Sequence, residues 1–576
     1  MKLKDIKIEN FRGIRSLHIP LDKLTVLIGE NNTGKSTLLE AIRIVLTGGF
    51  GSRRAGQFTE YDFHLENSEA TPETAKPIQI TLHFAEEKED EWPETVIQQM
   101  NEVIQIDEDG LSHIWLRAEG RFNPDSSSFE TKWNFLDSKG VELVLKNAIP
   151  LNLLSRFVPI FYLSALRDAS QEFGQRGRFW RGFLKSVQLP DEKREEIEEI
   201  LRDVNTSVIG ANAGLTEVKT KLADTGKLIP LGADDPVVLE AIPTRIFDMV
   251  GKIQVHLKSP FGAKLPLYRH GEGTQNLAVL MLFQAFVSEN LAETYAPESI
   301  PLLIMEEPEA HLHPSAIRSL GSFLQSMNGQ ILVSSHSGDL VSRVPLTSLR
   351  RLYKDNIETK IGYVENNTFD DRELQTIDYS IRLTKGHYLF SRCWLLVEGE
   401  TEFHLIPLLF EIMGYSQDQI SFSVIEIGQM IKKGEPIIKL AKALGIQWFM
   451  MADGDNAGND YINRAQKHLE NGESLADRAQ KLDHADIEHE FWHNGYEDFI
   501  ENLITDKRKK EIESKAAGDD IEKTKLLIKA AINKVGGKPA FAQALAAEVQ
   551  QRGKESIPKA IKDIITRVVE LSGSIT

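Results

Sequence analysis

The 576-residue sequence has one cysteine, no long hydrophobic run and no overall excess of positive charge. The single cysteine, Cys393, excludes a disulfide framework and a thiolate zinc cage, and favours a reducing compartment. The most apolar helical stretch, residues 277–287, is shorter than the roughly 20 residues that span a membrane. The first residues alternate charged and apolar side chains, unlike a signal peptide. We therefore expect a cytoplasmic protein with no membrane partner.

The charge is distributed unevenly along the chain. The 85 acidic residues outnumber the 67 basic ones, giving a net charge of −18, which excludes a protein that coats nucleic acid by bulk positive charge. Acidic groups that hold divalent metal stay compatible with this balance. Residues 507–576 differ, because they carry 15 Lys and Arg against 9 Asp and Glu. This basic tail is interpreted either as a solvated helical face or as a site for a polyanion.

Length and periodicity indicate an α/β protein of several domains. Short apolar strands alternate with helices in the N-terminal part, and a Glu-, Lys- and Arg-rich helical pattern interrupts them. From Trp394 onward strand and helix units alternate, as in a parallel sheet covered by helices. The predicted segments are 1–167, a helical insertion at 168–245, 246–380, 385–506 and a helical tail at 507–576.

A phosphate-binding loop stands between a predicted buried strand and a predicted helix. Residues 29–36 (GENNTGKS) match the pattern G-x-x-x-x-G-K-[ST], in which backbone N–H groups surround phosphates, the lysine reaches the terminal phosphates and the serine binds magnesium. We expect ATP here. The predicted binding residues are Gly29, Asn32, Gly34, Lys35, Ser36 and Thr37.

A second apolar strand ends in carboxylates, within the run LLIMEEPE at 302–309. Glu306 is predicted to hold magnesium through water, and Glu307 to orient or deprotonate the attacking water. A third strand runs into the sequence SSHS at 334–337, where His336 is predicted to sense the γ-phosphate. Together the three motifs describe a nucleotide hydrolase.

This motif set resembles the ABC-type ATPases. Their signature segment is similar to HGEGTQ at 270–275, and the resemblance implies that Gly273 and Gln275 close over the nucleotide of a second subunit, so that the ATPase acts as a dimer. The segment IENFRG at 8–13 is similar to the start of the RecF and SMC-like branch, which serves DNA repair and processing.

Two later strands also end in carboxylates, within LLVEGETE at 395–402 and FMMADGD at 449–455. Because the carboxyl ends of parallel strands meet at one edge of a sheet, these side chains are expected to converge. Grouped carboxylates suit Mg²⁺ or Mn²⁺, and metal-activated water would hydrolyse a phosphodiester. The predicted metal ligands are Glu398, Glu402, Asp453 and Asp455, of which Glu398 and Asp455 are also assigned to catalysis.

The ordered pair of motifs resembles the Toprim domain of topoisomerases, primases and nucleases. An ABC-type ATPase followed by a Toprim domain resembles the OLD (overcoming lysogenization defect) family of ATP-dependent DNA endonucleases, in which residues 168–245 would be the helical dimerisation insert. The resemblance implies a further acidic ligand, predicted as Glu497 with Glu490 and Asp498 as alternatives. It also implies a late lysine that stabilises charge on the scissile phosphate, predicted as Lys538 with Lys554 as the alternative.

The resulting hypothesis is an ATP-regulated, Mg²⁺- or Mn²⁺-dependent DNA endonuclease in anti-phage defence. Its expected partners are DNA, further copies of the chain, and a co-encoded helicase or reverse transcriptase. Two alternatives stay open, which are a DNA-repair or chromosome-maintenance ATPase with a regulatory Toprim domain, and an effector that cuts RNA.

Overall fold

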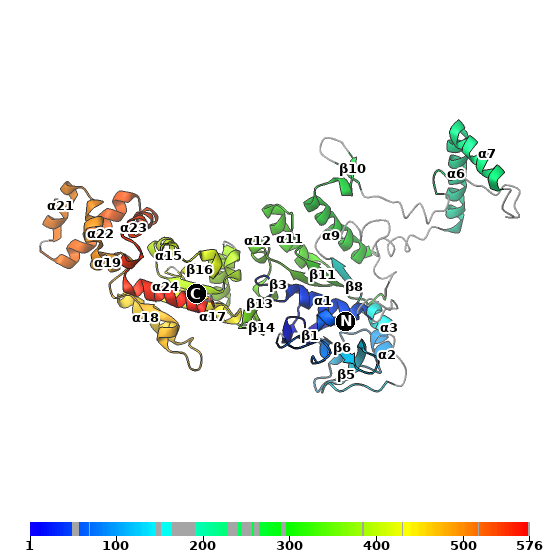
Figure 1. The fold of residues 1–576 in the computed structure, drawn as a ribbon, viewed down its shortest axis with the longest axis horizontal. Coiled ribbons are helices and arrows are strands. Elements are labelled where there is room, and N and C mark those ends of the chain that lie inside the picture. Colours follow the sequence, from blue (N-terminus) through cyan, green and yellow to red (C-terminus); the bar gives the residue numbers. More distant parts are fainter. Residues whose placement is uncertain are drawn as a thin grey trace.

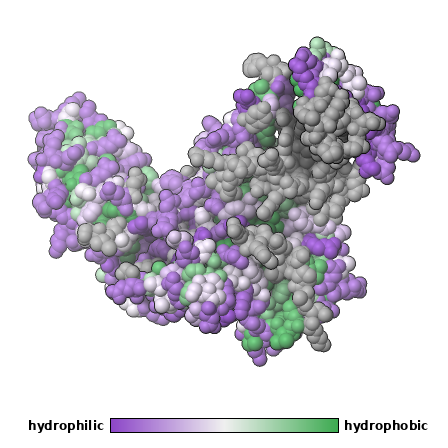
Figure 2. All heavy atoms as spheres, turned by 45° about the vertical axis from the view of Figure 1, so that its right-hand side comes forward, coloured by the Kyte–Doolittle hydropathy of each residue, from purple (hydrophilic) through white to green (hydrophobic). Residues whose placement is uncertain are grey.

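The computed structural model describes most of the chain. The described residues are 1–48, 57–67, 69–145, 151–163, 190–226, 240–243, 256–258, 264–289, 295–356, 358–382, 385–428, 430–516 and 518–573. About half of the predicted insertion at 168–245 is described, at 190–226 and 240–243, but both of its predicted ends lie outside the described residues, so its boundaries stay a prediction. No described helix is long and apolar enough to cross a membrane. On the face drawn in Figure 2, the described residues are mainly hydrophilic.

An antiparallel sheet begins the chain, with strands in the order β2-β1-β4-β6-β5 and β7 paired to β6. Along β1 and β4 alternate apolar side chains are buried, as expected for a sheet with one covered face. Its strands are β1 (Lys2–Phe11), β2 (Ile14–Pro20), β4 (Ile78–Ala85), β5 (Gln105–Ile106), β6 (Ser112–Asn123) and β7 (Ser128–Leu136). Helix α2 (Glu94–Met100) lies between β4 and β5 in the chain.

A second, mostly parallel sheet carries the phosphate loop, in the order β14-β13-β3-β12-β11-β8. Only β14 runs antiparallel to its neighbour among these described strands. The strands are β3 (Leu24–Ile28), β8 (Ile160–Leu163), β11 (Leu302–Glu306), β12 (Gln330–Ser334), β13 (Leu349–Asp355) and β14 (Glu358–Tyr363). The helices of this part are α1 (Lys35–Thr47), α3 (Leu151–Phe157), α9 (Glu272–Glu289), α11 (Pro314–Ser326), α12 (Gly338–Val341) and α13 (Asp371–Ile377).

Two helices, α6 (Asp191–Gly210) and α7 (Ala213–Gly226), form a hairpin that projects from the second sheet (Figure 1). A short ribbon, β9 (His256–Lys258) paired with β10 (Lys264–Pro266), follows in the chain.

The third sheet is parallel, in the order β16-β15-β17-β18. Its strands are β15 (Cys393–Val397), β16 (Phe422–Glu426), β17 (Gln447–Ala452) and β18 (Ala479–Lys481). The helices between them are α15 (Glu400–Ile412), α16 (Gln417–Ile420), α17 (Glu435–Ala443) and α18 (Asn456–Gln466). The α/β fold class predicted from the sequence is confirmed.

The tail is helical, as the sequence predicts. Its described helices are α21 (Asp506–Ala516), α22 (Asp520–Val535), α23 (Lys538–Arg552) and α24 (Lys559–Leu571), and α19 (Ile487–Phe491) and α20 (Glu497–Asn502) precede it in the chain. Buried residues of α23 and α24, such as Phe541 and Ile561, share one hydrophobic cluster with Leu395 of β15. The tail therefore completes the third sheet's unit, while α21 and α22 extend outward at the far end of the molecule (Figure 1).

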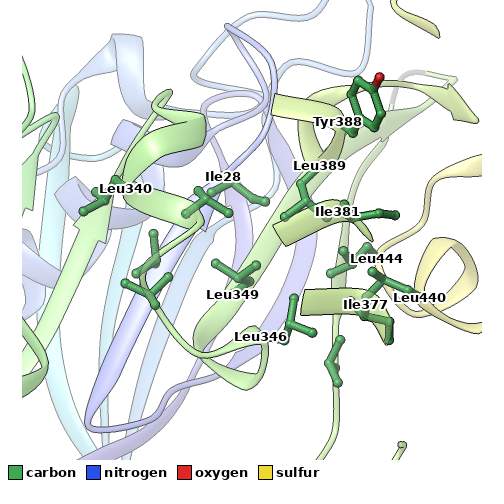
Figure 3. Packing of buried hydrophobic residues seen from close by; sticks show 14 of the residues in the cluster. Ile28, Leu340, Leu346, Leu349, Ile377, Ile381, Tyr388, Leu389, Leu440 and Leu444 are labelled. Carbon is green, nitrogen blue, oxygen red and sulfur yellow. The ribbon is translucent and has the colours of Figure 1, made fainter. Parts of the chain in front are cut away.

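One hydrophobic cluster joins the second sheet to the third. It contains Ile28 at the end of β3, Leu349 of β13, and Leu440 and Leu444 of or beside α17. Figure 3 shows these side chains grouped across the boundary. The strand that leads into the phosphate loop is thus packed in the same core as the third sheet.

Candidate functional site

The phosphate loop adopts a conformation that only small residues allow at two points. Gly29 and Gly34 have φ values of 141° and 102°, and a Cβ on Gly29 would lie 2.1 Å from the carbonyl oxygen of Leu352. Lys35 Nζ donates hydrogen bonds of 2.8 Å to the carbonyl oxygens of both Gly29 and Glu30. Burial lowers the pKa of Lys35 to about 8, against the opposing charges of Glu307 and Glu30. The loop fits a phosphate ligand, which would take the place of these carbonyls around the ammonium group.

The magnesium ligands predicted from the sequence lie next to each other. Ser36 Oγ at the start of α1 donates a 3.0 Å hydrogen bond to Glu306 Oε2 at the end of β11. Tyr162 of β8 donates its hydroxyl to the other oxygen of Glu306. Glu306 therefore faces the phosphate loop as the sequence predicts, and Tyr162 is an additional partner that the motifs did not indicate as part of this site.

Glu307 and His336 also come together. Glu307 has a φ of 45°, and its backbone N–H donates to Ser334 O at 2.9 Å, which holds the turn after β11. His336 Nε2 lies 3.5 Å from Glu307 Oε1. Burial and the nearby charge of Lys35 lower the pKa of His336, so its neutral form is favoured at physiological pH. A neutral imidazole can both accept and donate a hydrogen bond beside the γ-phosphate position.

The segment at 270–275 begins helix α9 and packs against the turn after β11. A Cβ on Gly273 would lie 2.7 Å from the carbonyl oxygen of His311, and Gln275 Nε2 donates to His270 O at 2.7 Å. These contacts fix the orientation of the segment. Its predicted role, contact with the nucleotide of a second subunit, stays a prediction because the structure holds one chain.

The second group of carboxylates gathers at the carboxyl edge of the third sheet. Glu398 follows β15 and Asp453 follows β17, and Asp453 N donates a 2.8 Å hydrogen bond to Glu398 Oε1. Glu402, in the first turn of α15, is 3% exposed, and its buried Oε2 has no hydrogen-bond partner. Asp455 caps α18 by accepting from Gly458 N at 2.8 Å. The structure thus brings Glu398, Glu402 and Asp453 to one edge, with Asp455 next in the chain.

The fifth acidic residue at this edge is Glu488, which sequence reasoning passed over. Thr401 Oγ1 donates to the buried Glu488 Oε1 at 2.6 Å, and Lys538 Nζ lies 3.8 Å from the same oxygen. Glu497, by contrast, is exposed at the start of α20. Asp486, the N-cap residue of α19, adds another negative charge close to Glu488. The signal that could have identified Glu488 is the sequence Asp-Ile-Glu at 486–488, which follows the short strand β18.

The sequence alternatives occupy other surroundings. Glu490 is buried and accepts hydrogen bonds from His484 and Asn494. Asp498 is exposed and lies 3.5 Å from Arg552. Lys554 begins a short 3-10 helix after α23. Among the predicted late lysines, Lys538 is therefore the one beside the carboxylates.

The electrostatics of this edge reflect crowding of negative charge. Burial, reinforced by Glu488, raises the pKa of Glu402 to about 7. Burial, Glu402 and Glu398 together raise the pKa of Asp453 to about 9. Burial opposes the charge of Lys538, but Glu488 and Glu402 outweigh it and raise the pKa of the lysine. Such a site favours bound cations, which would offset the repulsion.

The donor set fits a hard divalent cation because it consists of carboxylate oxygens, one of them buried and unpartnered. The side chains approach one another without a preformed cage, since no three His, Cys, Asp or Glu side chains in the described part of the chain already adopt metal-holding geometry. To bind a divalent cation, either Glu398 would have to give up its hydrogen bond with the Asp453 amide, or the carboxylates would have to move closer together.

Comparisons with known proteins agree with this two-site arrangement. Residues 1–341 match the family described as AAA ATPase domain, and residues 389–455 match the overcoming lysogenization defect protein-like TOPRIM domain. The chain belongs to the AAA ATPase domain family, and its residues 389–455 carry a TOPRIM domain of the overcoming lysogenization defect type. It has an AAA-type ATPase fold followed by a TOPRIM domain and a helical C-terminal part, which confirms the resemblance drawn from the motifs.

Three relatives are similar to this chain over most of its length. The chain is 26% identical to "Uncharacterized protein YbjD" of Escherichia coli K12 over 99% of both chains. It is 24% identical to the "OLD nuclease" of Thermus scotoductus, over 79% of this chain and 82% of the relative. It is 23% identical to "Endonuclease GajA" of Bacillus cereus, over 71% of this chain and 67% of the relative.

Proposed function

We propose that this protein is an ATP-regulated, divalent-metal-dependent DNA endonuclease that serves in anti-phage defence. The observation that carries the proposal is the group of buried carboxylates beside Lys538 at the carboxyl edge of the TOPRIM sheet. Relatives named as nucleases support phosphodiester hydrolysis as its chemistry. The separate phosphate loop supports control by ATP.

Glu398, Glu402, Asp453, Asp455 and Glu488 would hold Mg²⁺ or Mn²⁺, which supplies an activated water and neutralises charge on the scissile phosphate. Lys538, with its pKa raised by the surrounding carboxylates, keeps its proton and places a positive charge where the phosphate gains negative charge. Thr401 orients Glu488 through its hydrogen bond. The lysine begins α23, so its backbone is fixed by the packed helix.

At the ATPase site, Lys35 would bind the terminal phosphates, and Ser36 with Glu306 would hold the nucleotide's magnesium. Glu307 would orient the attacking water, with His336 beside it. We propose that Gly273 and Gln275 complete the site of a second copy, so the active form is a homodimer or a higher homo-oligomer. DNA and a co-encoded helicase or reverse transcriptase are the other partners proposed.

Cleavage of supercoiled plasmid tests the nuclease. The wild-type chain with Mg²⁺ or Mn²⁺ should nick or linearise the plasmid, and Asp455→Ala should lower the rate at least about 100-fold, because removal of a group that acts on transition-state charge costs this much. Asp498→Asn is the matched control, since Asp498 is an exposed carboxylate outside the site, and it should cleave normally. Equal rates in wild type and Asp455→Ala would refute the nuclease assignment.

The same preparations separate the alternatives. A single-stranded RNA of matched length, cut in preference to plasmid, would replace the DNA assignment with the RNA-cleaving one. Lys35→Ala should lose ATP turnover yet keep metal-dependent cleavage, because the two sites use different residues. Glu307→Gln should slow ATP hydrolysis while nucleotide still binds, and equal loss of both would contradict its role.

A further inference from the structure

The loop that binds phosphate also makes an ion pair with the TOPRIM domain. Glu30, the second residue of the phosphate loop, accepts two hydrogen bonds of 2.7 Å from Arg392, one from Nε and one from a terminal guanidinium nitrogen. Arg392 directly precedes β15, the strand that ends at the carboxylate Glu398. A paired, two-bond contact of this kind fixes orientation as well as distance.

The backbone of Arg392 is fixed at the amino edge of the TOPRIM sheet. Its N–H donates to Ser421 O at 2.7 Å, just before β16, and its carbonyl oxygen accepts from Gln447 N at 2.8 Å, the first residue of β17. At the other end of the sheet, the Asp453 amide donates to Glu398. The five residues of β15 therefore separate Arg392 from Glu398, a distance of about 20 Å along one hydrogen-bonded strand.

A buried cation reinforces the same boundary. Arg351 of β13 is 2% exposed and donates to the carbonyl oxygens of Leu389, Ser391, Leu444 and Gly445 at 2.8–3.2 Å. Strand β13 pairs with β3, where Arg351 lies beside Ile28, the residue before the phosphate loop. Figure 3 shows Ile28 and Leu444 in the hydrophobic cluster that spans this boundary. The boundary can therefore transmit a shift of the loop as a movement of the sheet.

Bound nucleotide would act on the loop at Glu30. Lys35 donates hydrogen bonds to the carbonyl oxygens of Gly29 and Glu30, and phosphates at this site would compete with these carbonyls for its ammonium group. The phosphates would also bring negative charge next to the Glu30 carboxylate. Both effects act on the residue whose side chain holds Arg392.

We propose that Arg392 is a positioning residue that links the phosphate loop to Glu398, so that bound nucleotide changes the geometry of the carboxylate site. This inference rests on the proposed nuclease function and assigns the contact that regulates it. Arg392 touches neither a predicted metal ligand nor the nucleotide position. Its effect appears only in the response of cleavage to nucleotide, which a purely structural role would not change.

The test compares the full-length wild type with Arg392→Gln, Arg392→Lys and the control Lys439→Gln. Lys439 also forms an ion pair between the two units, with Glu373 at 2.9 Å, but lies away from the phosphate loop. Plasmid cleavage is measured with Mn²⁺, with and without a non-hydrolysable ATP analogue. The wild-type rate should change about five-fold or more with the analogue, and the Arg392→Gln rate should change less than two-fold.

In this experiment Arg392→Gln should cleave within about three-fold of wild type without nucleotide, and Lys439→Gln should keep the wild-type response. Arg392→Lys, which keeps one charge but not the paired contact, should respond in between. An unchanged response in Arg392→Gln overturns the proposal, as does an equal loss in Lys439→Gln or the absence of any response in wild type.

Hydrogen exchange of residues 393–397 separates this proposal from the nuclease assignment. The analogue should change exchange there in wild type and not in Arg392→Gln, even if neither protein cleaves DNA. If this exchange pattern is seen but neither protein cleaves DNA, the nuclease assignment is refuted and the proposed role of Arg392 is supported. The same exchange change in both proteins would overturn the link.

Discussion

At the scale of single residues, a buried carboxylate stands beside each of the two sites. Glu402 and Glu309 each have a buried carboxylate oxygen with no hydrogen-bond partner. Leaving such a group unpaired costs stability, so it is retained where a ligand or a neighbouring element needs it. Glu402 faces the proposed metal, whereas Glu309 accepts hydrogen bonds from Ser335 and the His336 amide and so holds the turn that carries His336.

Glu309 gives a pH prediction. Burial raises its pKa, although Ser335 and the His336 amide act in the opposite direction. The folded state therefore holds a proton that the unfolded chain has released, and this contribution to stability is present at low pH and lost as the pH rises through the folded pKa. The thermal midpoint of Glu309→Gln should fall less than that of wild type between pH 5 and pH 8. An equal fall of the thermal midpoint in both proteins over this pH range would contradict the role given to Glu309.

The residue scale also shows the limit of the sequence. The sequence predicted that Ser36 and Glu306 lie at the same site, because each motif directly follows a buried strand, and the structure places the two side chains in hydrogen-bond contact. The sequence favoured Glu497 over Glu490 and Asp498, but the place of these residues depends on the chain between β18 and α20, where a kink at Gly495 turns the backbone and leaves Glu497 exposed. Periodicity carries no information on such a turn.

At the scale of elements, apolar strand patterns were reliable because buried strands show long apolar runs. The strands predicted before the loop at 29–36 and within the runs at 302–309 and 449–455 correspond to β3, β11 and β17. Strand order was not predictable in the same way. The arrangement β16-β15-β17, which places Glu398 beside Asp453, follows from crossovers that the sequence pattern leaves open.

The α6–α7 hairpin predicts an oligomer. Six aliphatic side chains, each 37–53% exposed, recur on α6 at a spacing of four and on α7 at three and four, which gives each helix one apolar stripe. They are Ile200, Val204, Val208, Leu215, Val218 and Leu222. Val204→Glu combined with Val218→Glu should shift the mass in analytical ultracentrifugation toward monomer.

Arg202→Glu, two residues from Val204 and so on the opposite side of α6, is the control for this mutation and should leave the mass unchanged. An unchanged mass in the double variant would place the subunit contact elsewhere.

Helix α21 predicts a nucleic-acid contact. Lys507, Lys510 and Lys515 line a surface depression of about 530 Å³. Neighbouring Arg508 and Lys509 pair with Glu511 and Glu501, whereas the structure describes no salt bridge for these three lysines. Changing all three to Gln should weaken DNA binding and reduce the slope of log affinity against log salt by up to about three, as three lost phosphate contacts require.

The matched control for α21 changes the exposed lysines Lys23, Lys88 and Lys139 of the ATPase part to Gln. It removes the same charge and should keep the wild-type salt slope. Equal slopes in wild type and the α21 variant would show that α21 does not contact DNA.

At the scale of the whole molecule, the net charge of −18 is distributed unevenly between the parts of the chain. Part of the acidity is concentrated where strands end, and the basic surplus of 507–576 lies in the helices that carry Lys538 and the α21 lysines. In the proposed function, the protein would approach DNA through bound metal and through its basic C-terminal helices. One hydrophobic core contains residues of both the phosphate-loop sheet and the TOPRIM sheet, so the two sheets are packed together.

The most direct test of the account is metal-dependent plasmid cleavage by Glu488→Gln and Glu497→Gln. The two variants remove one carboxylate each, the first beside Lys538 and the second on the exposed start of α20. The account predicts wild-type cleavage by Glu497→Gln and a loss of at least about 100-fold in Glu488→Gln, because only Glu488 helps to hold the metal. Normal cleavage by Glu488→Gln together with loss in Glu497→Gln would contradict it.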